Sequence, residues 1–308
     1  MAFDAYLWSK QKISSLVDKI SNIKNDNLTI SPGQIWSIKK LLVLDYYIEG
    51  YVTIIRKHFK NWYYVDTHCG SGLFGFEEND LIDEKFPGSP LISAFRHSEY
   101  PFTDYLLSDI DQLAISALSQ RLRSLRPLVG THSYNPQVRD FATTVNIVEG
   151  MQKFGNAFLI FIDPQGFSEI RWDLMQRLLS IKKADVFFTF MTPFIAMNRT
   201  NADPGSSYET TLNEFYGDNT WTQQTTGDEL LNRYIEKIGE FKAHVFDIPV
   251  FRTGESKLYD ILIATDSIGG GNIISDATAI MDVTTTQMMR DALKVITKKS
   301  NDLTSWMK

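Results

Sequence analysis

The stretch Val65-Asp66-Thr67-His68-Cys69-Gly70-Ser71-Gly72 decides the fold of this 308-residue chain. Its first two residues, Val65 and Asp66, end an aromatic and β-branched run at residues 62–66. Such a run is typical of a buried strand. Glycines four and six positions after the acid permit a tight turn and let the backbone approach a ligand, as a nucleotide-type cofactor requires. The stretch therefore predicts a strand that leads into a cofactor-binding loop, and an ordinary strand-to-helix turn is the alternative.

Apolar runs elsewhere in the chain alternate with helical patterns. Leu41, Leu44, Ile48 and Tyr51 recur at helical spacing, so we expect a long helix from Pro32 onward. Further strands are expected at 105–108, 157–162 and 184–191, and further helices at 90–97, 111–125, 141–154 and 172–179. This alternation predicts an α/β fold with a mostly parallel sheet and helices on both faces.

The C-terminal part departs from the alternation. Residues 244–251 and 258–265 form two strand-like runs, and the six residues between them suit an antiparallel hairpin. A parallel sheet that finishes in such a hairpin resembles methyltransferase folds, whereas dinucleotide-binding sheets usually stay parallel. We therefore predict a Rossmann-like methyltransferase domain at 32–308, after an N-terminal helical extension at 1–31. An insertion at about 193–242 is expected over the substrate side of the sheet.

The glycine stretch also indicates which cofactor binds. It resembles the first motif of S-adenosylmethionine enzymes, in which the glycines pass beside the methionine moiety. Gly70, Gly72 and Gly75 also satisfy G-x-G-x-x-G, which leaves a nicotinamide or flavin cofactor as an alternative. The acidic stretch at 76–80 suits a pyrophosphate poorly. S-adenosylmethionine is therefore the predicted cofactor.

Acids and a helix start supply the other predicted cofactor contacts. Ser89 is expected as an N-cap before Pro90, at a helix N-terminus that could face the cofactor carboxylate. Asp109 is expected to accept from the ribose hydroxyls, with Asp111 as the alternative and a helix cap as the structural explanation for either. Asp140, after a strand-like run at 132–134, is expected near the adenine. The predicted cofactor-binding residues are Asp66, His68, Gly70, Ser71, Gly72, Ser89, Asp109 and Asp140.

The turn Asp163-Pro164-Gln165-Gly166-Phe167 carries the predicted chemistry. It follows a very apolar strand and should emerge at the carboxyl edge of the sheet, where open α/β folds bind ligands. Enzymes that methylate exocyclic amines of nucleobases use a similar Asp/Asn-Pro-Pro-aromatic turn. Here Gln165 replaces the second proline and the aromatic is displaced to Phe167. The predicted catalytic residues are Asp163, Pro164, Gly166 and Phe167, and a plain turn is the alternative.

Two polar residues and several basic ones concern the substrate. Asn198 and Arg199 are predicted substrate residues; Arg199 could hold a phosphate or carboxylate, with a surface ion pair as the alternative. The net charge of −6 means that a nucleic acid would need a local basic patch. The candidates for that patch, with a solvated helix face as the alternative explanation, are Lys57, Lys60, Arg121, Arg123 and Arg126.

Composition also bounds the compartment and the metal chemistry. The longest apolar runs are far too short to span a bilayer, and the N-terminus shows no apolar signal region. Cys69 is the single cysteine, which excludes an intrachain disulfide and leaves no multi-cysteine metal site. The five histidines are too dispersed to predict a metal site. We therefore expect a soluble, cytoplasmic protein without a metal.

Taken together, the blocks resemble the three-Cys-motif partner family, TcmP. They occur in one order between about residues 36 and 270, and the sequence departs from the family pattern at His68-Cys69 and at Gln165. The blocks are Lys40 with Leu44, Tyr47 and Tyr51, then Tyr64-Val65-Asp66, Gly70-Ser71-Gly72, Gly88-Ser89-Pro90, Phe161-Ile162-Asp163-Pro164 with Gly166, Asn198-Arg199, and Leu258-Tyr259-Asp260-Ile261-Leu262.

The resemblance implies a methyltransferase-like fold and a partner, because family members are typically encoded beside a three-Cys-motif protein that is similar to radical S-adenosylmethionine enzymes. Three hypotheses about function follow. The first is an S-adenosylmethionine-dependent methyltransferase that acts on a nucleobase or nucleic acid. The second is a cofactor-binding but catalytically silent partner of the three-Cys-motif protein. The third is a nicotinamide-dependent oxidoreductase.

Overall fold

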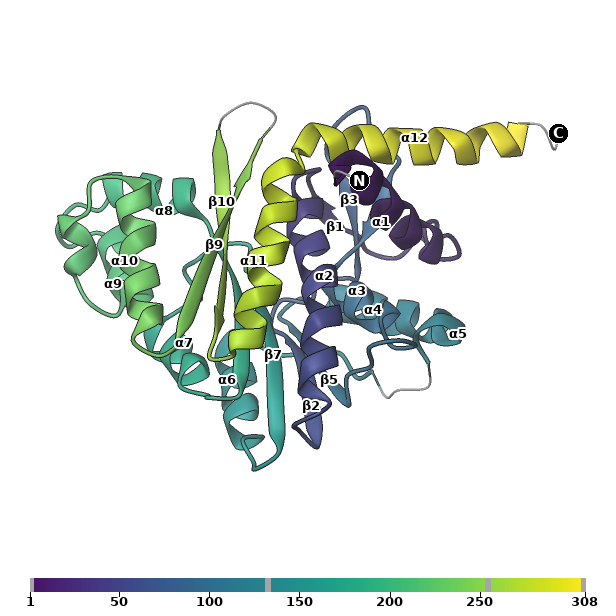
Figure 1. Cartoon of the computed structure of the whole chain (residues 1–308). Helices are drawn as coiled ribbons and strands as arrows, with labels where there is room; N and C mark the ends of the chain where they lie inside the picture. The colour runs from purple at the N-terminus through teal and green to yellow at the C-terminus, as the bar shows by residue number, and fades with distance from the viewer. Residues whose placement is uncertain (1–2, 131–133, 253–255, 306–308) are drawn as a thin grey trace.

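The fold is built on a seven-stranded sheet with the strand order β6-β5-β2-β7-β8-β10-β9 (Figure 1). The structure is a computed structural model that describes residues 3–130, 134–252 and 256–305. The strands of the sheet are β2 (Asn61–Asp66), β5 (Asp104–Asp109), β6 (Gln137–Val138), β7 (Asn156–Ile162), β8 (Ala184–Phe190), β9 (His244–Phe251) and β10 (Lys257–Thr265).

Strand direction confirms the predicted sheet. The five strands from β6 to β8 are parallel, and β10 runs antiparallel to both β8 and β9. From β2 the chain builds outward through β5 to β6, and then returns to the other side of β2 with β7. This reversal creates a switch point beside β2, and open α/β sheets bind ligands at the carboxyl ends of the strands there. Residues 253–255 of the predicted hairpin connection lie outside the described residues, as do residues 132 and 133 of the strand-like run at 132–134.

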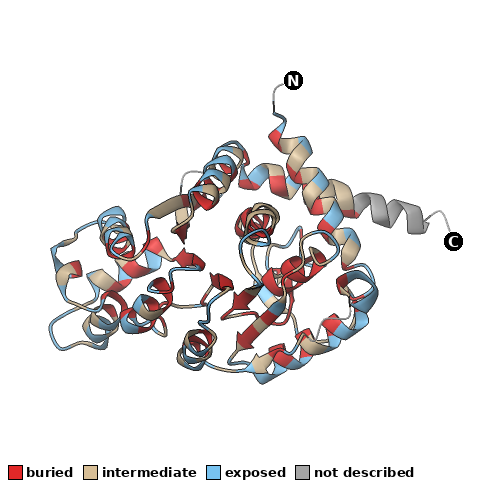
Figure 2. Cartoon of the chain, turned by 60° about the horizontal axis from the view of Figure 1, so that its bottom comes forward, coloured by how far each residue is buried: buried red, intermediate tan, exposed pale blue. Residues whose placement is uncertain are grey.

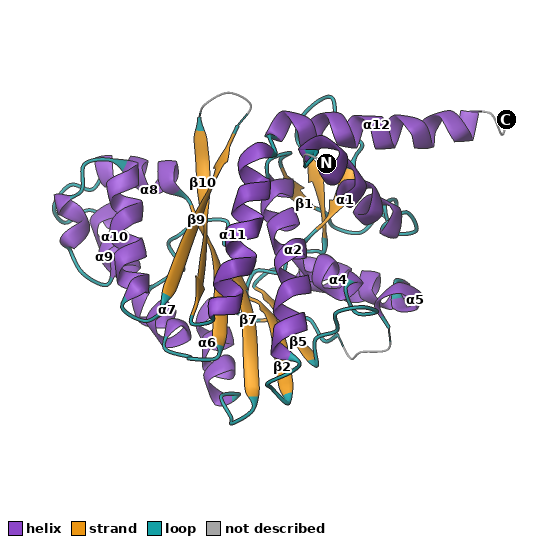
Figure 3. Cartoon of the chain, viewed as in Figure 1, coloured by secondary structure: helices purple, strands orange, loops and turns teal. Residues whose placement is uncertain are grey.

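Helices cover both faces of the sheet (Figure 3). One face carries α2 (Ser37–Ile55), α3 (Ser89–Phe95), α4 (Gln112–Ser124) and α11 (Ile268–Val283). The opposite face carries α6 (Phe141–Gly150), α7 (Trp172–Leu179), α9 (Ser207–Tyr216) and α10 (Gly227–Gly239). The remaining helices are α1 (Ala5–Lys19), α5 (Arg126–Val129), α8 (Thr192–Thr200), the 3₁₀ helix η1 (Thr220–Gln223) and α12 (Thr286–Ser305).

The core lies on both sides of the sheet, as the buried residues in Figure 2 show. Every residue of β7 and β8 is buried, because helices cover both faces of these central strands. Successive side chains enter opposite layers: Tyr64 packs with α2, and Val65 packs with the cluster beneath α6 and α7. The continuous apolar runs in the sequence therefore correspond to central strands that helices cover on both faces.

A small second sheet corrects the prediction for the region before the long helix. Pro32 does not begin that helix; it lies in β1 (Ser31–Gly33), and α2 begins at Ser37. β1 pairs with β3 (Leu73–Phe76), which in turn pairs with β4 (Lys85–Pro87). β1 is an edge strand, where a proline without an N–H group is tolerated. The chain before α2 therefore lies beside the segment that follows the glycine loop.

The predicted domain boundaries stay a prediction. Residues 1–31 contain α1, which packs against α12 at the other end of the chain. Residues 193–242 contain most of α8 together with α9, η1 and α10. Within the part of the chain that the structure describes, no helix combines the length and the apolar character needed to cross a membrane.

Candidate functional site

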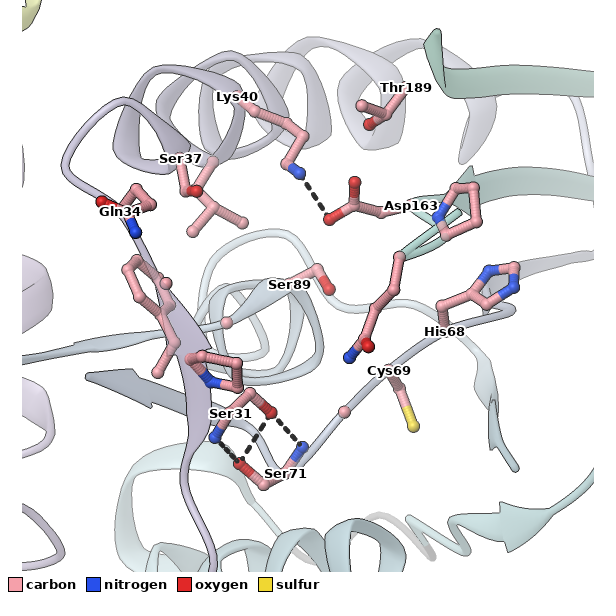
Figure 4. Close-up of a pocket in the computed structure, with 18 of the residues that line it drawn as sticks. Ser31, Gln34, Ser37, Lys40, His68, Cys69, Ser71, Ser89, Asp163 and Thr189 are labelled. Carbon is pink, nitrogen blue, oxygen red and sulfur yellow. Dashed lines mark hydrogen bonds and ion pairs between the residues drawn. The ribbon is translucent and has the colours of Figure 1, made fainter. Parts of the chain in front are cut away.

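A cavity of about 690 Å³ opens at the carboxyl edge of the parallel strands. Its walls come from the glycine loop after β2, the end of β5, the turn after β7 and the segment from β1 into α2. Figure 4 shows these walls around one space, with Lys40 and Asp163 on one side and Ser31 and Ser71 on the other. The topology thus brings together residues that lie more than 100 positions apart in the sequence, such as Lys40 and Asp163.

The backbone of the glycine loop requires glycine at two positions. Gly70 and Gly72 adopt the left-handed φ values of 57° and 84°. A Cβ atom on Gly72 would lie 2.7 Å from Cδ1 of Leu118, so a larger residue there would displace the Leu118 side chain in addition to straining the backbone. Gly70, Ser71 and Gly72 line the cavity, as the sequence predicts for cofactor-binding residues. The loop can therefore present backbone to a ligand at close range.

A buried arginine supports this loop from behind. Arg121 on α4 is fully buried, and its Nη1 donates to the carbonyl oxygen of Ser71 at 2.7 Å and of Thr29 at 2.8 Å. Its Nε and Nη2 donate to the carboxylate of Asp26 at 2.8 and 3.0 Å. The sequence offers two explanations for Arg121, a nucleic-acid patch and a solvated helix face, and its burial shows that both are wrong for this residue. Arg123, on the same helix, is exposed.

β1 holds the loop from the other side. The Ser31 and Ser71 hydroxyl oxygens lie 3.2 Å apart, and the Ser31 backbone N–H donates to the Ser71 hydroxyl. The Ser71 hydroxyl donates to the carbonyl oxygen of Leu73 at 2.7 Å. The glycine loop is therefore fixed by contacts with β1 and α4, both distant in sequence, and does not depend on its own turn geometry alone.

Asp109 lies at the end of β5 and lines the cavity. One carboxylate oxygen accepts from the backbone N–H of Gly70 at 2.8 Å, and the other accepts from that of Asp111 at 2.9 Å. The acid therefore ties β5 to the glycine loop, and each oxygen keeps a second lone pair for a ligand. Asp111 also lines the cavity and caps α4 by accepting from Leu113.

Asp66 lies beneath the cavity and does not line it. It is fully buried and accepts from the Tyr64 hydroxyl at 3.1 Å and from the His68 backbone N–H at 3.3 Å. Burial raises the pKa of the Asp66 carboxyl to about 7, although hydrogen bonds from Ser89 and Tyr64 oppose the rise. Ser89 is not the predicted N-cap: Gly88 occupies that position, and Ser89 is the first residue of α3.

The raised pKa of Asp66 predicts a pH dependence of stability. Between about pH 4 and pH 7 the folded protein keeps the Asp66 proton that the unfolded chain releases, so this group lowers stability as pH rises. We expect the free energy of unfolding of Asp66→Asn, relative to the unaltered protein, to increase by about 1.4 kcal/mol per pH unit across that window and to level off above it. Urea titrations at pH 4.5, 6 and 7.5 measure this; an equal difference at all three values would contradict it.

Lys40 engages the acid of the predicted catalytic turn. Asp163 and Pro164 line the cavity, and Nζ of Lys40 lies 2.5 Å from Oδ2 of Asp163. The Lys40 side chain is only 9% exposed, and its Nζ lies 5.3 Å from the centre of the Tyr259 ring. This pair fixes the Asp163 side chain. Lys40 was not among the predicted site residues, although its place four residues before Leu44, on the apolar face of the helix, is a signal that a lysine there has a buried partner.

The aromatic ring of the predicted turn lies in the core. Phe167 is 3% exposed and does not line the cavity; its ring packs edge-on against Phe194 at 5.7 Å and Phe215 at 5.0 Å. Gly166 also lies outside the cavity lining. Phe194, from the first turn of α8, does line the cavity and is 44% exposed. The aromatic surface beside the turn therefore comes from Phe194 of α8, whereas the sequence predicts Phe167 of the turn itself.

His68 lies in the cavity wall next to an acid. Its Nδ1 lies 2.8 Å from the Thr67 hydroxyl oxygen, and its Nε2 lies 3.3 Å from Oε1 of Glu169. The imidazole stacks on the Phe141 ring, with 24° between the ring planes and 5.9 Å between the ring centres. These three contacts orient the ring between the glycine loop and the turn after β7. The structure therefore places His68 among the residues that could face a ligand.

Three other predicted site residues lie outside the cavity lining. Asp140 caps α6, accepting from the Thr143 backbone N–H at 2.7 Å. Asn198 is buried and donates to the carbonyl oxygen of Phe194 at 2.8 Å. Arg199 donates to the carbonyl oxygens of Gln224 at 2.8 Å and Thr222 at 3.3 Å. In this structure these side chains cap a helix and hold the segment over the sheet together.

The charges on the cavity wall are mostly negative. Lys40 is the one lysine or arginine among the described residues that line the cavity, and it pairs with Asp163. The carboxylates of the wall are those of Glu77, Asp109, Asp111, Asp163 and Glu169. Such a wall favours ligands with positive or no net charge over anions.

The comparisons with known proteins add likenesses at low identity. No family model and no curated protein matches this chain. A Legionella pneumophila protein is similar at 12% identity over 78% of this chain and 89% of that chain, with a TM-score of 0.45. The plantazolicin methyltransferase BpumL in complex with SAH shares 12% identity over 84% and 99%, with a TM-score of 0.36. Spermidine synthase from Thermotoga maritima shares 13% over 73% and 59%, with a TM-score of 0.38.

These likenesses are too weak to carry an argument about function, and the three-Cys-motif partner family stays a prediction. The strand order of the sheet describes the fold without reference to these comparisons. A mostly parallel sheet that ends in an antiparallel hairpin is the arrangement that the sequence predicts, and the structure adds the reversal of strand order beside β2. The chain therefore has a methyltransferase-like α/β fold.

Proposed function

We propose that this protein binds S-adenosylmethionine along the glycine loop and transfers its methyl group to an acceptor held beside Asp163. The observation that carries the proposal is that the glycine loop and the Asp163-Pro164 turn line one shared cavity of about 690 Å³. Backbone with left-handed glycines on one wall suits a nucleoside-type ligand, and a carboxylate on the facing wall suits an acceptor.

The residues of this chain divide the work between the two ligands. Gly70, Ser71 and Gly72 would lie along the methionine part, and Asp109 would accept from the ribose hydroxyls. When bound, S-adenosylmethionine supplies an electrophilic methyl group on a positively charged sulfur. The excess of carboxylates on the wall favours that charge. The predicted contact of Asp140 with the adenine is not part of this arrangement, because Asp140 lies outside the cavity lining.

Asp163 would position the acceptor. Lys40 donates to Oδ2, so Oδ1 is the oxygen that would accept a hydrogen from an acceptor amine. Holding the amine in one orientation aims the nitrogen lone pair at the methyl carbon, and such positioning is a large part of catalysis in two-substrate reactions. We therefore retain the predicted amine acceptor of nucleobase type.

Calorimetry separates the proposed function from the nicotinamide alternative. We expect S-adenosylmethionine and S-adenosylhomocysteine to bind with Kd values of about 1–100 µM, and NAD⁺ and NADP⁺ to show no heat of binding at ten times those concentrations. Gly72→Val is the matched variant and should weaken this binding, because a Cβ there would lie 2.7 Å from Cδ1 of Leu118 at a left-handed φ that valine rarely adopts. Saturable binding of a nicotinamide dinucleotide in place of the methyl donor would contradict the proposal.

Transfer of a tritiated methyl group separates the enzyme from the silent-partner alternative. Labelled S-adenosylmethionine is incubated with the protein and a cell extract, and the extract is then divided into nucleic acid, protein and small molecules. We expect enzyme-dependent label in one fraction. Cofactor binding without label in any fraction would favour the catalytically silent partner.

A three-Cys-motif protein stays the predicted partner. The prediction rests on the family resemblance of the sequence blocks and on no contact in this single chain. If it holds, the two proteins expressed together should elute as one species in size-exclusion chromatography at micromolar concentration. Separate elution at that concentration would count against the partner and would leave the methyltransferase proposal intact.

A further inference from the structure

Phe194 lines the cavity and offers it an aromatic surface that the described residues cover only in part. The residue is 44% exposed and lies on the first turn of α8. Phe167 packs edge-on against it, with ring planes 71° apart, and so supports the ring from the core side. A supported ring that remains partly open is suited to receive a second ring, such as a nucleobase, by stacking.

Polar groups line the same cavity as this ring. Asp163 and the exposed Gln165 both belong to the turn after β7, and both line the cavity with Phe194. A carboxylate accepts hydrogens from an amino group, and an amide both donates and accepts. A ring that carries an amino group next to ring nitrogen or carbonyl oxygen could use stacking and both of these polar groups at once.

The charge of the wall limits what else the acceptor can carry. Lys40 is already paired with Asp163, so no described lysine or arginine of the lining is left for a phosphate. Glu169 lies beside His68 in the same wall, and the whole chain carries a net charge of −6. Proteins that hold single-stranded nucleic acid combine stacking rings with a positively charged groove, and the second of these features is missing among the described lining residues.

We propose that the methyl acceptor is an uncharged heteroaromatic amine, of the size of a free nucleobase or nucleoside, which stacks on Phe194 and donates its amino hydrogens to Asp163. This inference rests on the proposed function and deepens it. The amine nitrogen forms a bond to the methyl carbon, the carbon–sulfur bond breaks with its electron pair on sulfur, and the nitrogen releases a proton to water. Phe194 thus takes the place that the sequence gives to Phe167.

The test measures binding to protein saturated with S-adenosylhomocysteine, so that the nucleoside part of the cofactor site is filled. Adenosine, cytidine and guanosine are compared with their 5′-monophosphates and with ten-nucleotide single strands of the same bases, by ligand-observed NMR and calorimetry. We expect at least one nucleoside to bind. Its monophosphate should bind about fivefold more weakly, and the oligonucleotide more weakly still, because each added phosphate meets the acidic wall.

Substitutions on α8 test whether Phe194 is the ring on which the nucleoside stacks. Phe194→Leu should weaken the bound nucleoside about tenfold, and Phe194→Trp should keep its affinity within threefold. Met197→Leu is the matched control, because Met197 is 53% exposed on the same helix and lies outside the cavity lining. All three variants should bind S-adenosylhomocysteine within twofold of the unaltered protein, which also shows that they are folded.

Each other outcome has a defined meaning. Tighter binding of a monophosphate or an oligonucleotide than of its nucleoside would overturn the proposal, as would unchanged nucleoside affinity in Phe194→Leu. Binding of S-adenosylhomocysteine without binding of any nucleoside would overturn the acceptor class and leave the cofactor intact. Failure of S-adenosylhomocysteine to bind would instead remove the proposed function itself.

Discussion

We expect Asp163→Ala to lower methyl transfer about 100-fold to 1,000-fold while the affinity for S-adenosylmethionine changes less than threefold. The loss follows because the carboxylate is the group of the β7 turn that would orient the acceptor amine, whereas the proposed cofactor contacts belong to the loop after β2 and the end of β5. Label transfer from tritiated S-adenosylmethionine measures the first quantity, and calorimetry measures the second.

Three further variants distinguish a loss of catalysis from a failure to fold. Alanine at position 163 leaves the buried Lys40 ammonium without its partner, which is costly in itself, so the double variant Lys40→Met with Asp163→Ala removes both charges. Asp163→Asn keeps an oxygen that accepts hydrogen and should retain activity within about tenfold. Asp173→Ala, a half-exposed acid in a surface pair, should leave both quantities unchanged. Full activity in the double variant would remove Asp163 from the reaction.

The sheet could be predicted because its signals are local. Buried central strands require uninterrupted apolar runs, and β7 and β8 lie where such runs occur. The antiparallel hairpin follows from the short connection between its strands, which leaves no room for a crossover. β1 escaped prediction, since three residues around a proline resemble the start of a helix. Only the pairing with β3, 43 positions away, makes this segment a strand.

The site was predictable where backbone chemistry decides it. The left-handed glycines and the acid at the end of β5 follow from the sequence, because few other residues serve at those positions. The side-chain environment was not predictable: whether Phe167 or Phe194 faces the cavity depends on the packing of α8 and α9 against the turn. The pairing of Lys40 with Asp163 likewise depends on how α2 crosses the sheet edge.

The buried environment of Arg121 is a further feature that the sequence does not predict. We expect its replacement to lower the stability of the fold more than the other substitutions named above. The guanidinium is fully buried and satisfies the Asp26 carboxylate together with the carbonyl oxygens of Thr29 and Ser71. Arg121→Ala removes this donor from the two carbonyl oxygens and leaves the Asp26 carboxylate with the Leu28 backbone N–H but without its charged partner. We expect the free energy of unfolding to fall by about 3–5 kcal/mol, measured by urea denaturation at pH 7.

The neighbouring arginine of the same helix is the matched control. Arg123 is exposed, so Arg123→Ala should change the free energy of unfolding by less than about 0.5 kcal/mol. Because Arg121 donates to Ser71 within the glycine loop, its loss should also weaken S-adenosylmethionine binding about tenfold even where the variant is folded, whereas Arg123→Ala should not. Equal effects of the two substitutions would mean that the buried arginine neither holds the loop nor stabilises the fold.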